Sequence, residues 1–221
     1  MEVQNNLKFI LNTIPENVLL VAVSKTKPVN MILDAYNTGH RDFGENKAQE
    51  MAAKHEQLPK DIHWHFIGHL QTNKVKYIAS YVHLIHAVDS LKLLREINKH
   101  AQKNDRIIDF LLEFHIAREE SKFGLTLEQA KIIIESEEFS DFKNVRLCGV
   151  MGMATFTDDT NQIRKEFRLL KSYFDSLKAD YFANSTEFKE ISMGMSGDYP
   201  IAIEEGATIV RIGSKIFGSR N

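Results

Sequence analysis

Lys25 stands at the end of an apolar run that is typical of a buried strand. The run is Leu19-Leu20-Val21-Ala22-Val23-Ser24, and it has the β-branched composition of such strands. An amine that is partly shielded from water has a lowered pKa, and its neutral form attacks carbonyl carbons. The alternative is a surface lysine whose ammonium group reaches water, which is how we interpret Lys27 two residues later.

Two turns rich in glycine and serine lie near the C-terminal end. Ser192-Met193-Gly194-Met195-Ser196-Gly197 follows one short apolar run, and Gly213-Ser214 follows the next. Backbone N–H groups in such turns bind anions, so the pair favours a phosphate site over two ordinary tight connections. A reactive lysine beside a phosphate site indicates a phosphorylated aldehyde held as a Schiff base.

Arg211 is a third unusual residue, because it interrupts the β-branched run Ile209-Val210-Arg211-Ile212. A guanidinium cannot lose its proton in a protein, so an arginine that points into an apolar interior needs an acceptor. A ring nitrogen or a phosphate would serve. A carboxylate in a structural ion pair would serve equally well.

Other polar residues indicate structure rather than chemistry. His63, His65 and His69 come close together, but no carboxylate or cysteine pattern completes a metal site. We therefore expect hydrogen-bonded histidines and no metal. Cys148 is the single cysteine and lies in an apolar run, which predicts an inert buried thiol.

The elements that position these residues alternate between short apolar runs and longer segments of helical period. The expected strands are Leu19–Lys25, Arg41–Glu45, Ile62–Ile67, His83–Val88, Ile107–His115, Val145–Met151, Phe188–Ser192 and Thr208–Ile212. The expected helices are Val3–Asn12, Pro28–Asn37, Lys47–Gln57, Asn73–Tyr81, Leu91–Lys103, Thr126–Ser136, Thr160–Lys178 and Tyr199–Glu205.

Eight strands in this alternation predict a parallel sheet, and the count favours a closed (β/α)8 TIM barrel over an open doubly wound sheet. An additional helix precedes the first strand. No linker or change of composition divides the chain, so we expect one domain over residues 1–221. In such barrels the chemistry lies at the C-terminal ends of the strands, where Lys25, the two turns and Arg211 all fall.

Composition excludes several classes of partner. The net charge of −2 provides no basic field for nucleic acid, and the basic stripe on 160–178 has the spacing of a solvated helix face. No stretch approaches the roughly 18 apolar residues of a membrane span, and the N-terminus lacks the features of a signal peptide. We expect a soluble, cytoplasmic monomer.

Five segments together closely resemble one known family, the pyridoxal phosphate homeostasis proteins. The segments are VAVSKTKP at 21–28, FGEN at 43–46, WHFIGHLQTNK at 64–74, ISMGMSGD at 191–198 and VRIGSKIFG at 210–218. They occur in order over nearly the whole chain. The resemblance implies a barrel of the alanine racemase N-terminal type that binds pyridoxal 5′-phosphate (PLP).

The resemblance also implies a role for each site residue. Lys25 matches the lysine that forms the Schiff base with PLP, and Asn46 matches an asparagine that lines the cofactor. Arg211 matches the arginine directed at the pyridine nitrogen. The positions that match the phosphate-binding residues are Ser192, Ser196, Gly213 and Ser214, and which serine makes the contact stays open.

Two functions remain in competition after the resemblance. An amino-acid racemase needs a proton-transferring base on each face of the cofactor, and alanine racemase takes its second base from an added C-terminal domain. The sequence ends at Asn221, so we expect that domain to be absent, and no spacing recommends Tyr181 or Tyr199 as a substitute. The sequence therefore favours a non-enzymatic carrier that buffers PLP and delivers it, with apo PLP-dependent enzymes as possible recipients.

Overall fold

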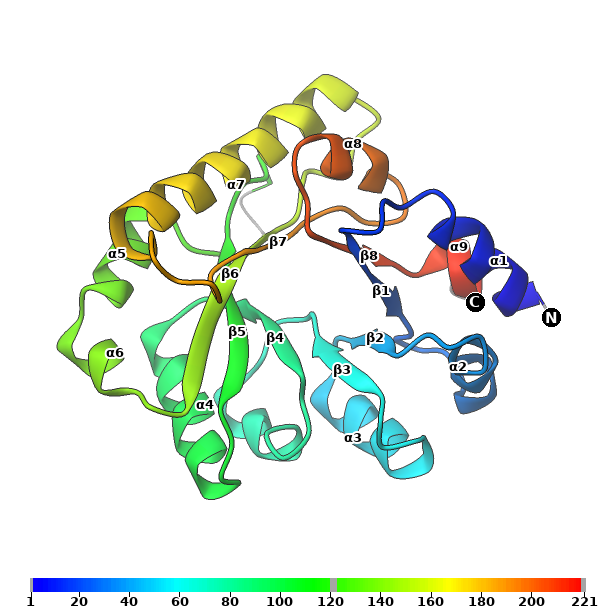
Figure 1. Cartoon of the computed structure of the whole chain (residues 1–221), viewed down its shortest axis with the longest axis horizontal. Coiled ribbons are helices and arrows are strands. Elements are labelled where there is room, and N and C mark those ends of the chain that lie inside the picture. The colour runs from blue at the N-terminus through cyan, green and yellow to red at the C-terminus, as the bar shows by residue number, and fades with distance from the viewer. Residues whose placement is uncertain (1, 120–122, 220–221) are drawn as a thin grey trace.

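A closed barrel of parallel strands forms the centre of the molecule. The structure, a computed structural model, describes residues 2–119 and 123–219. Within these residues eight strands follow one another around the barrel in chain order, and β8 pairs with β1 to close it. Figure 1 shows the strands at the centre and the connecting helices outside them. The predicted (β/α)8 fold is confirmed.

Each predicted strand is present, within two residues of its expected bounds. The strands are β1 (Leu19–Val23), β2 (Asp42–Glu45), β3 (His63–Phe66), β4 (Leu84–Val88), β5 (Ile108–Phe114), β6 (Val145–Gly152), β7 (Glu190–Ser192) and β8 (Ile209–Ile212). The first strand ends before Lys25. Thr26 has a left-handed backbone (φ 65°), and the Lys27 N–H donates to Ser24 O at 3.0 Å, so Lys25 lies in a tight turn.

The helices follow the predicted order with three differences: one segment forms a 3₁₀ helix, and two short helices, at 137–141 and 214–217, were not among those expected. The helices are α1 (Glu2–Leu11), α2 (Val29–Tyr36), α3 (Ala48–Gln57), the 3₁₀ helix η1 (Thr72–Tyr77), α4 (Leu91–Lys103), α5 (Leu127–Ile134), α6 (Glu137–Asp141), α7 (Thr160–Tyr181), α8 (Tyr199–Glu204) and α9 (Ser214–Phe217).

The predicted α-helix over Asn73–Tyr81 is wrong, because this segment forms η1 with bonds of the i to i+3 type, such as Lys74 N–H to Gln71 O. Helix α6 was not predicted. Its N-cap is Ser136, whose hydroxyl accepts from the Phe139 N–H at 3.2 Å, and the helix buries no residue. Five residues without a buried face carry no detectable hydrophobic period.

Apolar side chains fill two separate layers. The larger layer lies between the barrel and the helices. The smaller one fills the barrel interior with Val21, Leu84, Ala87, Leu111, Cys148, Met151 and Ile209. Burial raises the pKa of the Cys148 thiol to about 12, as the predicted inert thiol requires.

Helix α1, near the N-terminus, packs against α9, near the C-terminus. It buries Val3, Leu7 and Ile10, and the Asn6 amide donates to Ile216 O of α9 at 3.2 Å. Figure 1 shows α1 and α9 side by side, with both termini on the same side of the barrel. The described residues contain no helix with the length and apolar character needed to cross a membrane.

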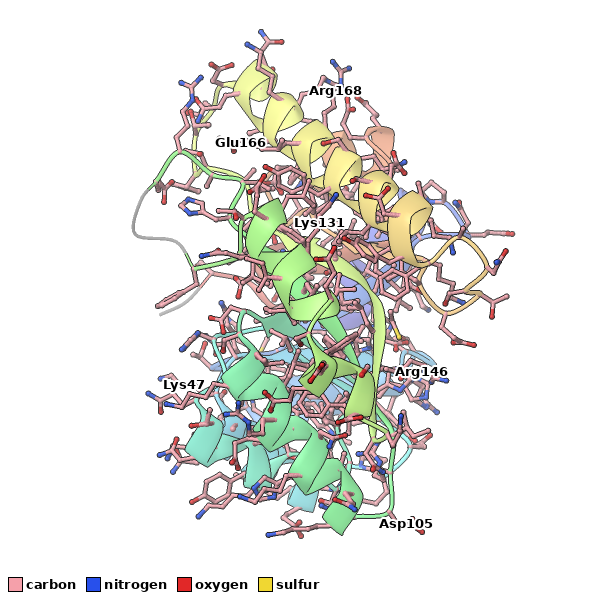
Figure 2. The ribbon with its side chains drawn as sticks, turned by 90° about the vertical axis from the view of Figure 1, so that its left-hand side faces the viewer. Lys47, Asp105, Lys131, Arg146, Glu166 and Arg168 are labelled. Carbon is pink, nitrogen blue, oxygen red and sulfur yellow. The ribbon has the colours of Figure 1, made fainter. Side chains whose placement is uncertain are left out.

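Both arginines of the basic stripe on α7 pair with neighbouring carboxylates. Arg164 pairs with Glu204 of α8 and with Glu205, which follows that helix, both at 2.5 Å, and Arg168 pairs with Glu205 at 2.8 Å. Figure 2 shows Arg168 on this long helix, together with Glu166. Because its arginines are matched in this way, the stripe offers little net positive charge to a nucleic acid.

Candidate functional site

The turn after β1 presents Lys25 at the C-terminal end of the barrel. The Ser24 N–H still follows the strand pattern and donates to Gly44 O at 3.0 Å, while its hydroxyl donates to Glu45 Oε1 at 2.6 Å. Ser24 therefore points toward Glu45 and α3. Because successive side chains of a strand alternate, Lys25 continues the inward face that begins with Val21, and its side chain is half-buried.

A buried lysine of α3 holds this turn from outside the barrel. The Lys54 ammonium donates to Ser24 O and Glu45 Oε1, both at 2.8 Å, and to Glu50 Oε1 at 2.7 Å. Glu50 in turn accepts from the Thr26 N–H at 2.6 Å. Burial raises the pKa of Glu45, although Lys54 and Ser24 act in the opposite direction. The residues on both sides of Lys25 are thus anchored to one helix.

Asn46 carries an unsatisfied acceptor at the end of β2. Among the described residues its Oδ1 finds no hydrogen-bond partner although the atom is buried. A Cβ at Gly68 would lie 2.6 Å from Asn46 O and 2.7 Å from Asn46 Cβ, so glycine is required where the chain leaves β3. Buried acceptors without partners are uncommon, and this one indicates a donor supplied by a ligand.

The two glycine and serine turns meet each other and the end of β1. The Gly213 N–H donates to Ser196 Oγ at 3.2 Å, which joins the turn after β8 to the turn after β7. A Cβ at Gly213 would lie 3.0 Å from Val23 O, a tight contact that would require β1 to shift by a few tenths of an ångström. Ser214 follows and is exposed. Ser196, Gly213 and Ser214 therefore lie at the same end of the barrel as Lys25.

Arg211 lies inside the barrel and is 4% exposed. It donates from Nη1 to Ser192 Oγ at 2.5 Å and from Nη2 to Gly152 O at 3.1 Å, and both acceptors are uncharged. Burial lowers the pKa of Arg211 to about 10, so the guanidinium keeps its charge at neutral pH. A buried cation bound to neutral acceptors is available to a further acceptor above it.

Ser192 is separated from the other predicted phosphate residues. It is fully buried on β7, and its Oγ bonds both Arg211 Nη1 and His86 Nδ1, the latter at 2.8 Å. Its hydroxyl therefore makes both of these hydrogen bonds inside the barrel. Of the two serines that the sequence left open, Ser196 is the one that lies in the turn.

Glu113 lies inside the barrel beside the candidate site residues but was not singled out from the sequence. It pairs in register with Met151, which pairs with Ser192, so Glu113 lies at the same level of the barrel. It is 3% exposed, and its Oε2 finds no partner in the part of the chain that the structure describes. Burial and the charge of Asp89 raise the pKa of Glu113 to about 7, against the effect of Arg211. The available signal was a carboxylate inside the apolar run Ile108–Phe114.

The histidines behave as hydrogen-bonded barrel residues, as predicted. His63 Nδ1 lies 3.2 Å from Asp42 Oδ1, and His65 Nε2 lies 3.1 Å from the same oxygen. His69 Nδ1 lies 3.3 Å from Asp89. The described residues contain no group of three or more side chains placed to hold a metal ion.

The sequence profile of the family "Alanine racemase, N-terminal domain" matches residues 2–221. The chain is 42% identical over 202 residues to the pyridoxal phosphate homeostasis protein of Aquifex aeolicus, covering 91% of this chain and 86% of the relative. It is 38% identical over 214 residues to the human protein of the same name, covering 91% of this chain and 76% of the relative.

Solved structures agree with these matches. PipY of Synechococcus elongatus without PLP superposes with a TM-score of 0.89 at 32% identity, covering 98% of this chain and all (100%) of PipY. The same protein with PLP bound gives 0.88 at 30% identity, with the same coverage. Alanine racemase of E. faecalis shares the fold at a TM-score of 0.74 and 15% identity, with 99% of this chain covering 58% of that chain. The chain therefore belongs to the alanine racemase N-terminal domain family and, within it, to the pyridoxal phosphate homeostasis proteins.

Proposed function

We propose that this protein binds PLP as a Schiff base on Lys25 and contributes to PLP homeostasis by holding and delivering the cofactor without catalytic turnover. The observation that carries the proposal is the convergence of four features at one end of the barrel. These are the anchored turn of Lys25, the buried Arg211, the unsatisfied Asn46 Oδ1 and the joined turns of Ser196 and Gly213. The PLP-bound PipY structure supports the choice of ligand.

The residues present fit the chemical groups of PLP. When bound, PLP supplies an aldehyde, which joins a lysine amine through a carbon–nitrogen double bond with loss of one water. Lys25 would provide the amine and Arg211 would donate toward the ring nitrogen. Ser196, Gly213 and Ser214 would hold the phosphate through hydroxyl and backbone N–H groups. Asn46 Oδ1 would accept from a donor of the ligand.

The environment of the site supports holding the cofactor rather than turning over substrates. A guanidinium does not readily transfer its proton, so Arg211 would leave the ring nitrogen unprotonated and the ring a weak electron sink. Tyr199 is committed elsewhere, because its hydroxyl lies 3.0 Å from Thr13 Oγ1. The Tyr181 hydroxyl donates to Glu135. Neither tyrosine is therefore placed as the second base of a racemase.

A carrier role leads to proposals for the compartment, the oligomeric state and the recipients of PLP. The protein would be a cytoplasmic monomer that buffers PLP, and apo PLP-dependent enzymes would be its recipients. These assignments rest on the family and on the proposed site.

Titration with PLP tests the binding proposal. The wild-type protein should become yellow and saturate, and Lys25→Ala should lose the visible absorbance of the lysine adduct. Lys27→Ala is the matched control, because this nearby lysine donates to Ser219 O at 2.8 Å and should not be needed. Equal absorbance in Lys25→Ala and wild type would contradict the proposal.

Hydrogen exchange at the α-carbon of amino acids tests the absence of turnover. The PLP-loaded protein, incubated with α-deuterated alanine and a panel of other amino acids, should release no deuterium at enzymatic rates. Exchange at several turnovers per second, a typical enzymatic rate, would contradict the absence of turnover.

A further inference from the structure

A continuous chain of polar side chains crosses the barrel interior below the proposed site. It runs from Arg211 on β8 through Ser192 on β7, His86 on β4 and His65 on β3 to Asp42 at the start of β2. The successive distances are 2.5 Å (Arg211 Nη1 to Ser192 Oγ), 2.8 Å (Ser192 Oγ to His86 Nδ1), 3.0 Å (His86 Nε2 to His65 Nδ1) and 3.1 Å (His65 Nε2 to Asp42 Oδ1).

The two ends of the chain determine the direction of every hydrogen bond. Arg211 can only donate, and a carboxylate such as Asp42 can only accept. Burial acts to raise the pKa of Asp42, but the hydrogen bond from His65 and the neighbouring His63 and His40 act in the opposite direction, so the pKa is lowered and the group is ionised. His65 therefore donates from Nε2 to Asp42 and accepts at Nδ1 from His86 Nε2. His86 Nδ1 then accepts the proton of the Ser192 hydroxyl.

The reversed arrangement satisfies fewer groups. If His86 carried its proton on Nδ1, that proton would point at Ser192 Oγ, which already accepts from Arg211. The proton of the fully buried Ser192 hydroxyl would then lack an acceptor within the chain, at a cost of about 1–3 kcal/mol. Burial, followed by the charge of Arg211, also keeps the pKa of His86 well below its usual value, so the ring stays neutral.

We propose that Asp42, His65 and His86 are positioning residues for Arg211, acting through a one-way hydrogen-bond chain that holds the Ser192 hydroxyl as an acceptor for its guanidinium. The inference that this affects PLP rests on the proposed function, because Arg211 is the group that would face the cofactor ring. None of the three positioning residues is placed in contact with PLP. Asp42 lies at the opposite end of its strand from Asn46, so the effect is carried through the chain.

The tautomers of the two histidines test the direction of the chain without any cofactor. In ¹⁵N-histidine NMR spectra of the PLP-free protein, His65 and His86 should both be neutral with the proton on Nε2. In Asp42→Ala this preference should weaken at both rings. His63→Ala is the control, because its half-exposed ring contacts the same Asp42 oxygen from outside the chain and should leave both tautomers unchanged. A proton on Nδ1 of either His65 or His86 in the wild type would overturn the proposal.

A double-mutant cycle tests the coupling to the site. Asp42→Ala and Ser192→Ala should each weaken PLP binding about tenfold, the equivalent of one hydrogen bond. The double variant should bind no more weakly than Ser192→Ala, since the chain is already cut next to Arg211. Distant and independent sites would instead give additive effects, which would overturn the proposal.

The outcomes separate this inference from the proposed function. If the wild type binds no PLP, the proposed function fails, and the tautomers of the PLP-free protein still decide the direction of the chain. If the wild type binds PLP and the cycle is additive, only the inference fails. His65→Leu cuts the same chain with an apolar side chain and replaces Asp42→Ala if circular dichroism shows that the latter does not fold.

Discussion

Glu113 is a buried acid that makes the stability of this barrel depend on pH. Its carboxyl group is enclosed near Arg211 and Ser192, and its pKa is raised to about 7, first by burial and then by the charge of Asp89. The folded protein therefore holds a proton on Glu113 at a pH where the unfolded chain, with an ordinary glutamate, has lost it. The fold is stabilised by this group below about pH 4.5, and that stabilisation is lost as the pH rises to about 7.

The first prediction concerns the pH dependence of stability in Glu113→Gln. The amide does not titrate, so the variant lacks the loss that the wild type undergoes between pH 4.5 and 7. The free energy of unfolding of the variant minus that of the wild type, measured by urea denaturation, should therefore increase by about 2 kcal/mol from pH 5 to pH 8. Glu137→Gln, at an exposed position of α6, is the matched control. A stability difference between Glu113→Gln and the wild type that does not change with pH would contradict the raised pKa of Glu113.

At the scale of elements, α3 and the β1–α2 turn act as one unit. Lys54 is 6% exposed and holds Ser24, Glu45 and Glu50 together, while Glu50 holds the left-handed Thr26. Lys25 lies between two residues that are fixed in this way. The geometry of the proposed reactive lysine therefore depends on a helix that contributes no residue to the cofactor.

The second prediction is that Lys54→Met destabilises the protein by about 3 kcal/mol, because it leaves buried carboxylates without their cation. It should also weaken PLP binding, since the turn of Lys25 loses its anchor. Lys47→Met is the control on the same helix. Lys47 is exposed at the start of α3, where Figure 2 shows it on the periphery of the molecule.

Urea denaturation and PLP titration measure the two effects of Lys54→Met separately. Equal stability of Lys54→Met and Lys47→Met would show that the buried network contributes nothing. Loss of stability with unchanged PLP affinity would show that the network supports the fold but not the site.

For the whole molecule, the sequence was sufficient to predict the barrel and to bring the proposed site residues to one end of it. The alternation of strand and helix patterns located all eight strands within two residues, and helix α4 was predicted with the observed bounds. Parallel strands in chain order place all their C-terminal ends together, so the proximity of Lys25, Asn46, Ser196 and Gly213 followed from topology. These residues are visible in sequence because each follows a strand.

The remaining parts of the site depend on contacts that no local pattern contains. The Ser192–His86 bond joins residues 106 positions apart, and the Lys54–Ser24 bond joins residues 30 apart. Lys54 resembles an ordinary helical lysine until the helix is packed on the barrel. Ser192 and Ser196 both follow the pattern of a phosphate turn, and only the inward direction of Ser192 on β7 separates them.

The central claim, that Lys25 holds PLP, is tested most directly by borohydride reduction of the PLP-loaded protein followed by peptide mass spectrometry. Reduction converts the carbon–nitrogen double bond into a stable single bond, so the labelled lysine can be identified. The predicted result is one pyridoxyl group per chain, located on Lys25. A label on Lys27 or Lys215 with Lys25 unmodified, or no label on any lysine, would contradict the account.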